Sequence, residues 1–124
     1  NIDLLGFINP MDMNSYYKKA DLVICRSGAI TLTELANYGI PSILIPFPKS
    51  ANNHQFYNAK YFSDNDAAIV VEQRKLNSGK LEQTFTELFN EKDKLKKMQL
   101  GLQKISKPDS VLNISKLILE GNNV

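Results

Sequence analysis

The chain has 124 residues, of which 43% are hydrophobic and 23% are charged, and its formal net charge is +2. This size and composition are typical of one globular domain, so we expect residues 1–124 to form a single domain. The single cysteine excludes an internal disulfide, no apolar run is long enough to span a membrane, and the small net charge does not indicate nucleic acid binding.

Short apolar runs alternate with helical patterns over the first part of the chain. In chain order, we expect a strand at 4–8, a helix that opens at the Asn9-Pro10 turn, a strand at 21–25, a helix at 31–38, a strand at 42–46, a helix at 54–62 and a strand at 67–71. This alternation predicts an α/β fold with a Rossmann-like parallel sheet and flanking helices, in which ligands bind beyond the carboxyl ends of the strands.

The chain from Gly79 onward has helical patterns only. Apolar residues at spacings of three and four predict helices at 81–89, 95–105 and 111–118. Residues 91–107 hold six lysines against two acidic residues. These lysines fall opposite the apolar stripe and are not interleaved with aromatic residues, so we interpret them as a solvated helix face rather than a site for nucleic acid or lipid.

A Ser-Gly turn lies between a predicted strand and the helix that follows it. Gly28 would let an anion approach the backbone, and the free N–H groups of Ala29, Ile30 and Thr31 at the helix start would receive it. Glu34 would then accept hydrogen bonds from the hydroxyls of a neighbouring sugar. The alternative is that Thr31 and Glu34 form a capping box, which satisfies only backbone donors.

A cluster of neutral polar residues opens the next predicted helix. Its members are Asn52, Asn53, His54, Gln55 and Asn58. The simpler interpretation is a solvated loop with an asparagine cap, and the alternative is that amides and an imidazole recognise sugar hydroxyls. Because both polar clusters follow neighbouring strands at one edge of the sheet, we expect them to face the same crevice.

Two other kinds of site have weaker support in the sequence. Cys25 and His54 would make a nucleophile and its base, but Cys25 ends an apolar strand, where a small buried hydrophobe is expected. No set of His, Cys, Asp and Glu residues has the spacing of a metal site. We therefore expect neither a catalytic cysteine nor a metal or other cofactor bound by this chain.

Three motifs, in this order, resemble one known family. They are the run 21–36 (DLVICRSGAITLTELA), the run 39–47 (GIPSILIPF) and the run 53–59 (NHQFYNA). Together they resemble the C-terminal domain of the MurG family, the bacterial N-acetylglucosaminyltransferases that complete lipid II. That family has the GT-B architecture, with the active site between two Rossmann-like domains, so the resemblance implies that this chain is part of such a C-terminal domain.

The resemblance implies roles for individual residues in binding the donor, UDP-GlcNAc. Glu34 matches the glutamate that holds the ribose hydroxyls, and Phe7 and Ile8 match a segment whose backbone pairs with uracil. The loop 48–53 is longer than its counterpart in the family. The remaining matches lie beside the diphosphate and the GlcNAc hydroxyls, and they are Gly28, Ala29, Ile30, Thr31, His54, Gln55 and Asn58.

The resemblance also implies what this chain lacks. The family's acceptor domain and catalytic base would precede Asn1, so we expect no catalytic residue within the chain and no transfer by the chain alone. The whole enzyme would move GlcNAc from UDP-GlcNAc to lipid I with inversion, as a peripheral protein at the cytoplasmic face of the bacterial membrane. The alternatives are another UDP-sugar transferase, such as the dolichol-linked GlcNAc transferase, a UDP-sugar epimerase, and a non-catalytic nucleotide-binding module.

Overall fold

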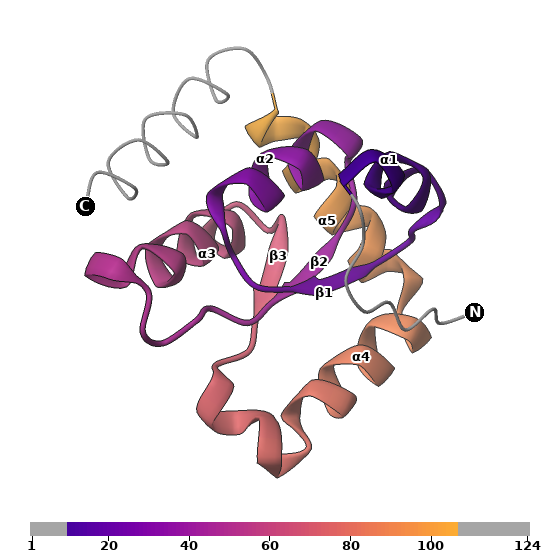
Figure 1. The fold of residues 1–124 in the computed structure, drawn as a ribbon. Coiled ribbons are helices and arrows are strands. Elements are labelled where there is room, and N and C mark those ends of the chain that lie inside the picture. Colours follow the sequence, from indigo (N-terminus) through magenta and orange to yellow (C-terminus); the bar gives the residue numbers. More distant parts are fainter. Residues whose placement is uncertain (1–9, 107–124) are drawn as a thin grey trace.

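The computed structural model describes residues 10–106, which contain a small sheet and the helices around it (Figure 1). The predicted strand at 4–8 and the predicted helix at 111–118 lie outside the described residues. The elements in chain order are α1 (Pro10–Lys19), β1 (Val23–Cys25), α2 (Ala29–Tyr38), β2 (Ser42–Leu44), the 3-10 helix η1 (Ala51–Asn53), α3 (His54–Asp64), β3 (Ala68–Val70), the 3-10 helix η2 (Gln73–Ser78), α4 (Lys80–Asn90) and α5 (Lys92–Ile105).

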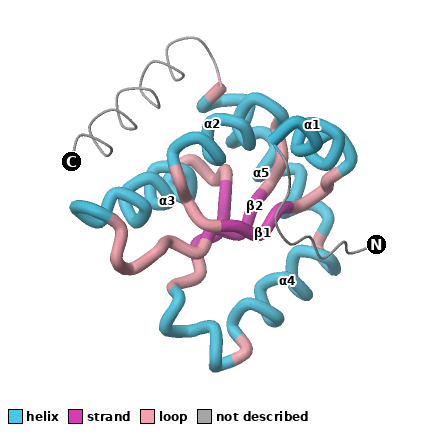
Figure 2. The backbone as a smooth tube through the Cα atoms, viewed as in Figure 1, coloured by secondary structure: helices cyan, strands magenta, loops and turns pink. Residues whose placement is uncertain are grey.

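The three strands form one parallel sheet in the order β1-β2-β3. Val23 pairs with Ser42, and Ser42 pairs in turn with Ala68, so the strands are in step along their lengths. Because neighbouring strands are parallel, the chain returns between them through α2 and then through α3 (Figure 2). The parallel α/β arrangement that the sequence predicts is confirmed, and the carboxyl ends of the strands gather at one edge of the sheet.

Local residues explain where the helices begin and end. Pro10 is the first residue of α1, a position where the missing N–H group would have no helical partner in any case. Gly39 ends α2 in the left-handed conformation, with φ 68° and ψ 38°, and its N–H donates to the Ala36 carbonyl oxygen at 3.3 Å. Pro41 follows and cannot continue a helix, so the chain passes directly into β2.

Both faces of the sheet are covered by helices. Leu44 belongs to a buried cluster with residues of α1, α2, α3 and α5, whereas its neighbour Ile43 belongs to a second cluster with residues of α4 and α5. Neighbouring residues of a strand point to opposite faces, which explains why the two residues join different clusters. In Figure 1, α1 and α2 accordingly lie above the sheet and α4 lies below it. The carboxyl edge of the sheet, rather than either face, is left for a site.

Candidate functional site

Two loops meet at the carboxyl edge of the sheet. One spans residues 26–28 after β1, and the other spans residues 45–53 between β2 and α3. The Arg26 guanidinium donates a hydrogen bond to the Ile45 carbonyl oxygen at 3.2 Å, and it lies 5.7 Å from the centre of the Phe47 ring. The two polar clusters predicted from the sequence are therefore held side by side.

Helix α2 begins at Ala29 rather than at the predicted Thr31. Gly28 is its N-cap residue, and no side chain caps the helix with a hydrogen bond. A capping box would need Thr31 as the N-cap, but Thr31 and Glu34 both lie inside the helix, so the capping-box interpretation is wrong. The first helical bond runs from the Leu32 N–H to the Gly28 carbonyl oxygen at 3.0 Å. The N–H groups of the first three helical residues have no partner among the described residues.

The open end of α2 is suited to an anion. Free N–H groups and the helix dipole both favour negative charge at a helix N-terminus. Gly28 leaves the backbone accessible, since a Cβ placed there would have Gln55 Nε2 as its nearest neighbour at 4.0 Å. Ala29 is buried, Thr31 is half-buried, and the side chain of Ile30 is 76% exposed beside the opening.

Glu34 lies one turn further along α2, beside Tyr17 of α1. Glu34 is half-buried and Tyr17 is buried. Burial, followed by the hydrogen bond to Glu34 and its negative charge, raises the pKa of the Tyr17 hydroxyl well above its ordinary value. A tyrosine that stays protonated can donate to the carboxylate and hold it in place. The Tyr17 ring is itself packed against Tyr38, with the ring centres 5.2 Å apart.

The first two residues of α3 offer complementary hydrogen-bonding groups. His54 Nδ1 lies 2.7 Å from the Ala51 carbonyl oxygen. Because a carbonyl oxygen only accepts, this contact assigns the proton to Nδ1 and leaves Nε2 as an acceptor in the neutral ring. Gln55 Oε1 accepts a hydrogen bond from the Phe47 N–H at 2.9 Å, which leaves its Nε2 amide group as a donor. A sugar hydroxyl both donates and accepts, so this pair suits a hydroxyl.

The three asparagines of the second cluster differ in their surroundings. Asn52 and Asn53 are exposed and have positive φ angles of 50° and 59°, which asparagine tolerates better than most residues. Asn53 is the N-cap residue of α3 but makes no side-chain capping bond, so the predicted asparagine cap is wrong. Asn58 is only 2% exposed, and its Nδ2 donates to the Ser27 carbonyl oxygen at 3.3 Å. Its Oδ1 is buried as well and has no hydrogen-bond partner among the described residues.

Burial raises the pKa of the Cys25 thiol from 9.0 to about 12, which opposes its use as a nucleophile near neutral pH. Within residues 10–106, no group of three or more His, Cys, Asp or Glu side chains is placed to hold a metal ion. The expectation that the chain binds no metal or other cofactor stays a prediction. Phe7 and Ile8 lie outside the described residues.

The chain matches the glycosyltransferase family 28 C-terminal domain over residues 1–114. It belongs to that family. Two similar curated proteins share the name "UDP-N-acetylglucosamine--N-acetylmuramyl-(pentapeptide) pyrophosphoryl-undecaprenol N-acetylglucosamine transferase". The one from Trichodesmium erythraeum is 45% identical over 109 residues, which cover 88% of this chain and 29% of that protein. The one from Coxiella burnetii is 38% identical over 103 residues, covering 83% of this chain and 29% of that protein.

A solved structure agrees with the family assignment. The crystal structure of Acinetobacter baumannii MurG is similar with a TM-score of 0.74 and 34% sequence identity, and the match covers 95% of this chain and 33% of that chain. The resemblance to MurG and the GT-B type of fold are thereby confirmed. This family 28 chain spans about a third of the length of the proteins that it matches.

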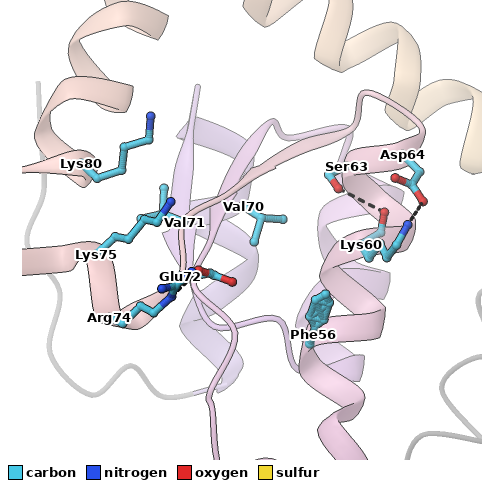
Figure 3. A pocket seen from close by; sticks show the side chains of 10 residues that line it. All are labelled: Phe56, Lys60, Ser63, Asp64, Val70, Val71, Glu72, Arg74, Lys75 and Lys80. Atoms are coloured by element: carbon cyan, nitrogen blue, oxygen red, sulfur yellow. Dashed lines mark hydrogen bonds and ion pairs between the residues drawn. The ribbon is translucent and has the colours of Figure 1, made fainter.

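The family 28 domain has a further pocket that the sequence did not indicate. It has a volume of about 490 Å³ and lies beyond the end of β3, between α3 and η2 (Figure 3). Two ion pairs form in its lining, Lys60–Asp64 at 2.9 Å and Arg74–Glu72 at 2.7 Å. All four side chains are exposed, so each pair contributes little to stability. Residues 72–78 match no helical or strand pattern, and the sequence therefore does not predict the pocket. The one signal available was the concentration of basic residues directly after a strand.

Proposed function

We propose that this chain is the donor-binding part of an inverting N-acetylglucosaminyltransferase, with UDP-GlcNAc as donor and lipid I as the acceptor of the whole enzyme. The names of the similar proteins support this reaction, since they describe the transfer of N-acetylglucosamine to an undecaprenol-linked N-acetylmuramyl acceptor. Because the chain corresponds to only 29% of those proteins, we assign the acceptor site and the catalytic base to the rest of the enzyme.

The observation that carries the proposal is the uncapped start of α2, with Gly28 beside Gln55. In the proposal, the free N–H groups at this helix end bind the diphosphate of the donor. Glu34 accepts hydrogen bonds from the ribose hydroxyls, and His54 and Gln55 bind hydroxyls of the GlcNAc ring through one acceptor and one donor. Asn58 is buried, so its part is to hold α3 against Ser27 through its Nδ2.

The chemistry is a displacement at the anomeric carbon of GlcNAc. The acceptor hydroxyl forms the new C–O bond on one face and gives its proton to the base assigned to the rest of the enzyme. The bond to UDP breaks on the other face, and UDP leaves with the electron pair. Negative charge therefore grows on the diphosphate, next to the N-terminus of α2. Donors fixed in place before the reaction stabilise such charge, so this chain would lower the barrier without supplying a catalytic residue.

The proposed acceptor is anchored in lipid, so the whole enzyme would work at a membrane surface. No helix between residues 10 and 106 has both the length and the apolar character needed to cross a bilayer. We place the whole enzyme at the cytoplasmic face of the bacterial membrane, where it would meet lipid I without being inserted.

Calorimetric titration of the chain with UDP, UDP-GlcNAc and UDP-glucose tests the proposal. We expect UDP and UDP-GlcNAc to bind and UDP-glucose to bind more weakly than UDP-GlcNAc. Glu34→Ala removes hydrogen bonds to a charged group and should weaken UDP binding by about 10- to 100-fold. Glu87→Ala, which removes an exposed carboxylate from α4, is the matched control and should leave UDP binding unchanged.

Other outcomes distinguish the alternatives. Unchanged UDP affinity in Glu34→Ala would contradict the ribose assignment. Equal affinity for UDP-GlcNAc and UDP-glucose would favour another UDP-sugar enzyme, such as an epimerase. In the whole enzyme, release of UDP only when lipid I is added would support the transferase, whereas release with a dolichol-linked acceptor alone would favour the eukaryotic type of reaction.

A further inference from the structure

Ser27 is buried at the point where the two loops of the site meet. It follows β1 and directly precedes Gly28, the N-cap residue of α2. Its side chain is fully buried, with 0% exposure, so it has no surface with which to touch a ligand. Any effect of Ser27 on binding must therefore act through other residues.

Ser27 is joined to α3 by both its side chain and its main chain. Ser27 Oγ donates to the Gln55 carbonyl oxygen at 2.6 Å, and the Ser27 carbonyl oxygen accepts from Asn58 Nδ2 at 3.3 Å. These partners are 28 and 31 residues away in sequence, so both bonds are tertiary contacts. Two bonds from one residue to successive turns of a helix fix both the distance and the rotation of α3 relative to the start of α2.

The bonds place the two halves of the proposed donor site. Gly28 carries the open helix end on one side, and Gln55 carries the free amide donor on the other. Gln55 is further restrained by the Phe47 N–H, which donates to its Oε1 at 2.9 Å. Loss of the Ser27 hydroxyl leaves that restraint and the bond from Asn58 to the Ser27 carbonyl oxygen in place, but it releases the backbone of Gln55 from Ser27. The separation between the diphosphate contacts and the sugar contacts would then be held less firmly.

We propose that Ser27 is a positioning residue that holds the first turn of α3 against the start of α2, so that one UDP-sugar can contact both at once. The inference rests on the proposed donor-binding function and adds a residue to it. Its specific consequence is an unequal loss of affinity. UDP contacts only the α2 side in the proposed arrangement, so it should be little affected, whereas UDP-GlcNAc should lose the contribution of His54 and Gln55.

The chain offers a close control in Ser42. Ser42 also has 0% exposure, but its Oγ has no hydrogen-bond partner among the described residues. Ser42→Ala and Ser27→Ala therefore each delete one buried serine Oγ, but only Ser27→Ala breaks a hydrogen bond. Removing an unpaired buried hydroxyl is close to neutral or stabilising, so Ser42→Ala reports what the deletion alone does.

The test is calorimetric titration of wild type, Ser27→Ala and Ser42→Ala with UDP and with UDP-GlcNAc. We expect Ser27→Ala to weaken UDP-GlcNAc binding by about tenfold and UDP binding by less than about threefold, while Ser42→Ala changes each by less than about twofold. Amide hydrogen exchange should also become faster in the first turn of α3 in Ser27→Ala alone. A general loss of stability would weaken both ligands alike, so equal losses would overturn the positioning role, as would Ser27→Ala behaving like Ser42→Ala.

Two further comparisons keep the result decisive. If Ser27→Ala does not fold, Ser27→Cys keeps most of the side-chain volume and replaces the hydroxyl by a weaker donor, and the same unequal loss of affinity is expected from it. Failure of the wild type to bind UDP or UDP-GlcNAc would overturn the proposed function itself. Binding by the wild type that is lost in Glu34→Ala but retained in Ser27→Ala would overturn only the role of Ser27.

Discussion

Gly28 is a residue that the protein fold does not itself require to be glycine. Its φ of −69° and ψ of 151° are open to any residue, and a Cβ would have no neighbour closer than 4.0 Å. Gly39 is the opposite case, since its φ of 68° favours glycine for conformational reasons. The comparison supports a ligand as the reason for glycine at position 28, because a bound diphosphate would occupy the space that a Cβ would take.

Gly28→Ala should therefore separate binding from stability. We expect the affinity for UDP to fall by about tenfold or more, with a change in the free energy of unfolding within about 1 kcal/mol, since the poorer N-cap is offset by a less flexible unfolded chain. Gly39→Ala should do the reverse and lower stability by about 1 kcal/mol or more without changing affinity. Titration calorimetry and urea unfolding measure the two quantities. Unchanged UDP affinity in Gly28→Ala would contradict a close approach of the diphosphate.

At the scale of the elements, α5 contributes residues to both buried clusters and lies very close to the turn between α3 and β3. Gly101 is buried in this helix, and a Cβ there would lie 2.9 Å from the carbonyl carbon of Asp66 and closer still to the carbonyl oxygen of Asn65. These atoms belong to the turn between α3 and β3, which is held by backbone hydrogen bonds such as that from the Ala67 N–H to the Phe62 carbonyl oxygen at 2.9 Å. The turn has little freedom to move away.

Gly101→Ala should consequently destabilise the chain although alanine is the better helix former. We expect the free energy of unfolding to fall by about 1–3 kcal/mol, the usual cost of overpacking a core, as measured by urea unfolding. Gln103→Ala, an exposed position of the same helix, should change it by less than about 0.5 kcal/mol. Equal stability of the two variants would mean that α5 can shift away from the turn.

The elements also show where sequence patterns are sufficient and where they are not. The periodic spacing of Leu95, Met98, Leu102 and Ile105 predicts α5 because burial of one helix face is a local property. The apolar spacing of Leu32, Leu35 and Ala36 predicts a helix from Thr31, whereas α2 begins at Ala29. Gly28 is the N-cap residue, and the hydroxyl of the preceding Ser27 is bonded to α3. A pattern within one segment cannot report a bond to another segment.

At the scale of the whole molecule, the two buried clusters enclose the strands from both sides, and the burial of Cys25 makes stability depend on pH. Cys25 ends β1 and packs against the larger cluster. Burial raises the pKa of its thiol from 9.0 to about 12 in the folded chain, whereas the unfolded chain keeps the ordinary value. Between these two values the unfolded state loses its proton first, so the folded state binds more protons and stability falls as the pH rises.

The chain should lose stability above about pH 9, and Cys25→Ala should remove part of that loss. The measurement is the free energy of unfolding in urea at intervals from pH 8 to pH 10. The Tyr17 hydroxyl also has a raised pKa, but its ordinary value is 10.0, so its effect begins at higher pH. Cys25→Ala is expected to be less stable at pH 8 because of the lost packing, so the slope with pH is the quantity to compare. An identical slope would show that the thiol is accessible to water in the folded chain.

The sequence by itself determined the alternation of strands and helices, the parallel sheet and the edge at which the polar residues gather. These features follow from periodic burial and from residues such as Gly39 and Pro41, which act within a few positions of themselves. Only the tertiary structure decided that Thr31 is not a cap, that Asn58 is buried, and that His54 and Gln55 have one acceptor and one donor to offer. The physical reason is that the role of a polar side chain depends on which of its atoms already have hydrogen-bond partners. The loops that supply many of those partners meet only when β1 and β2 pair.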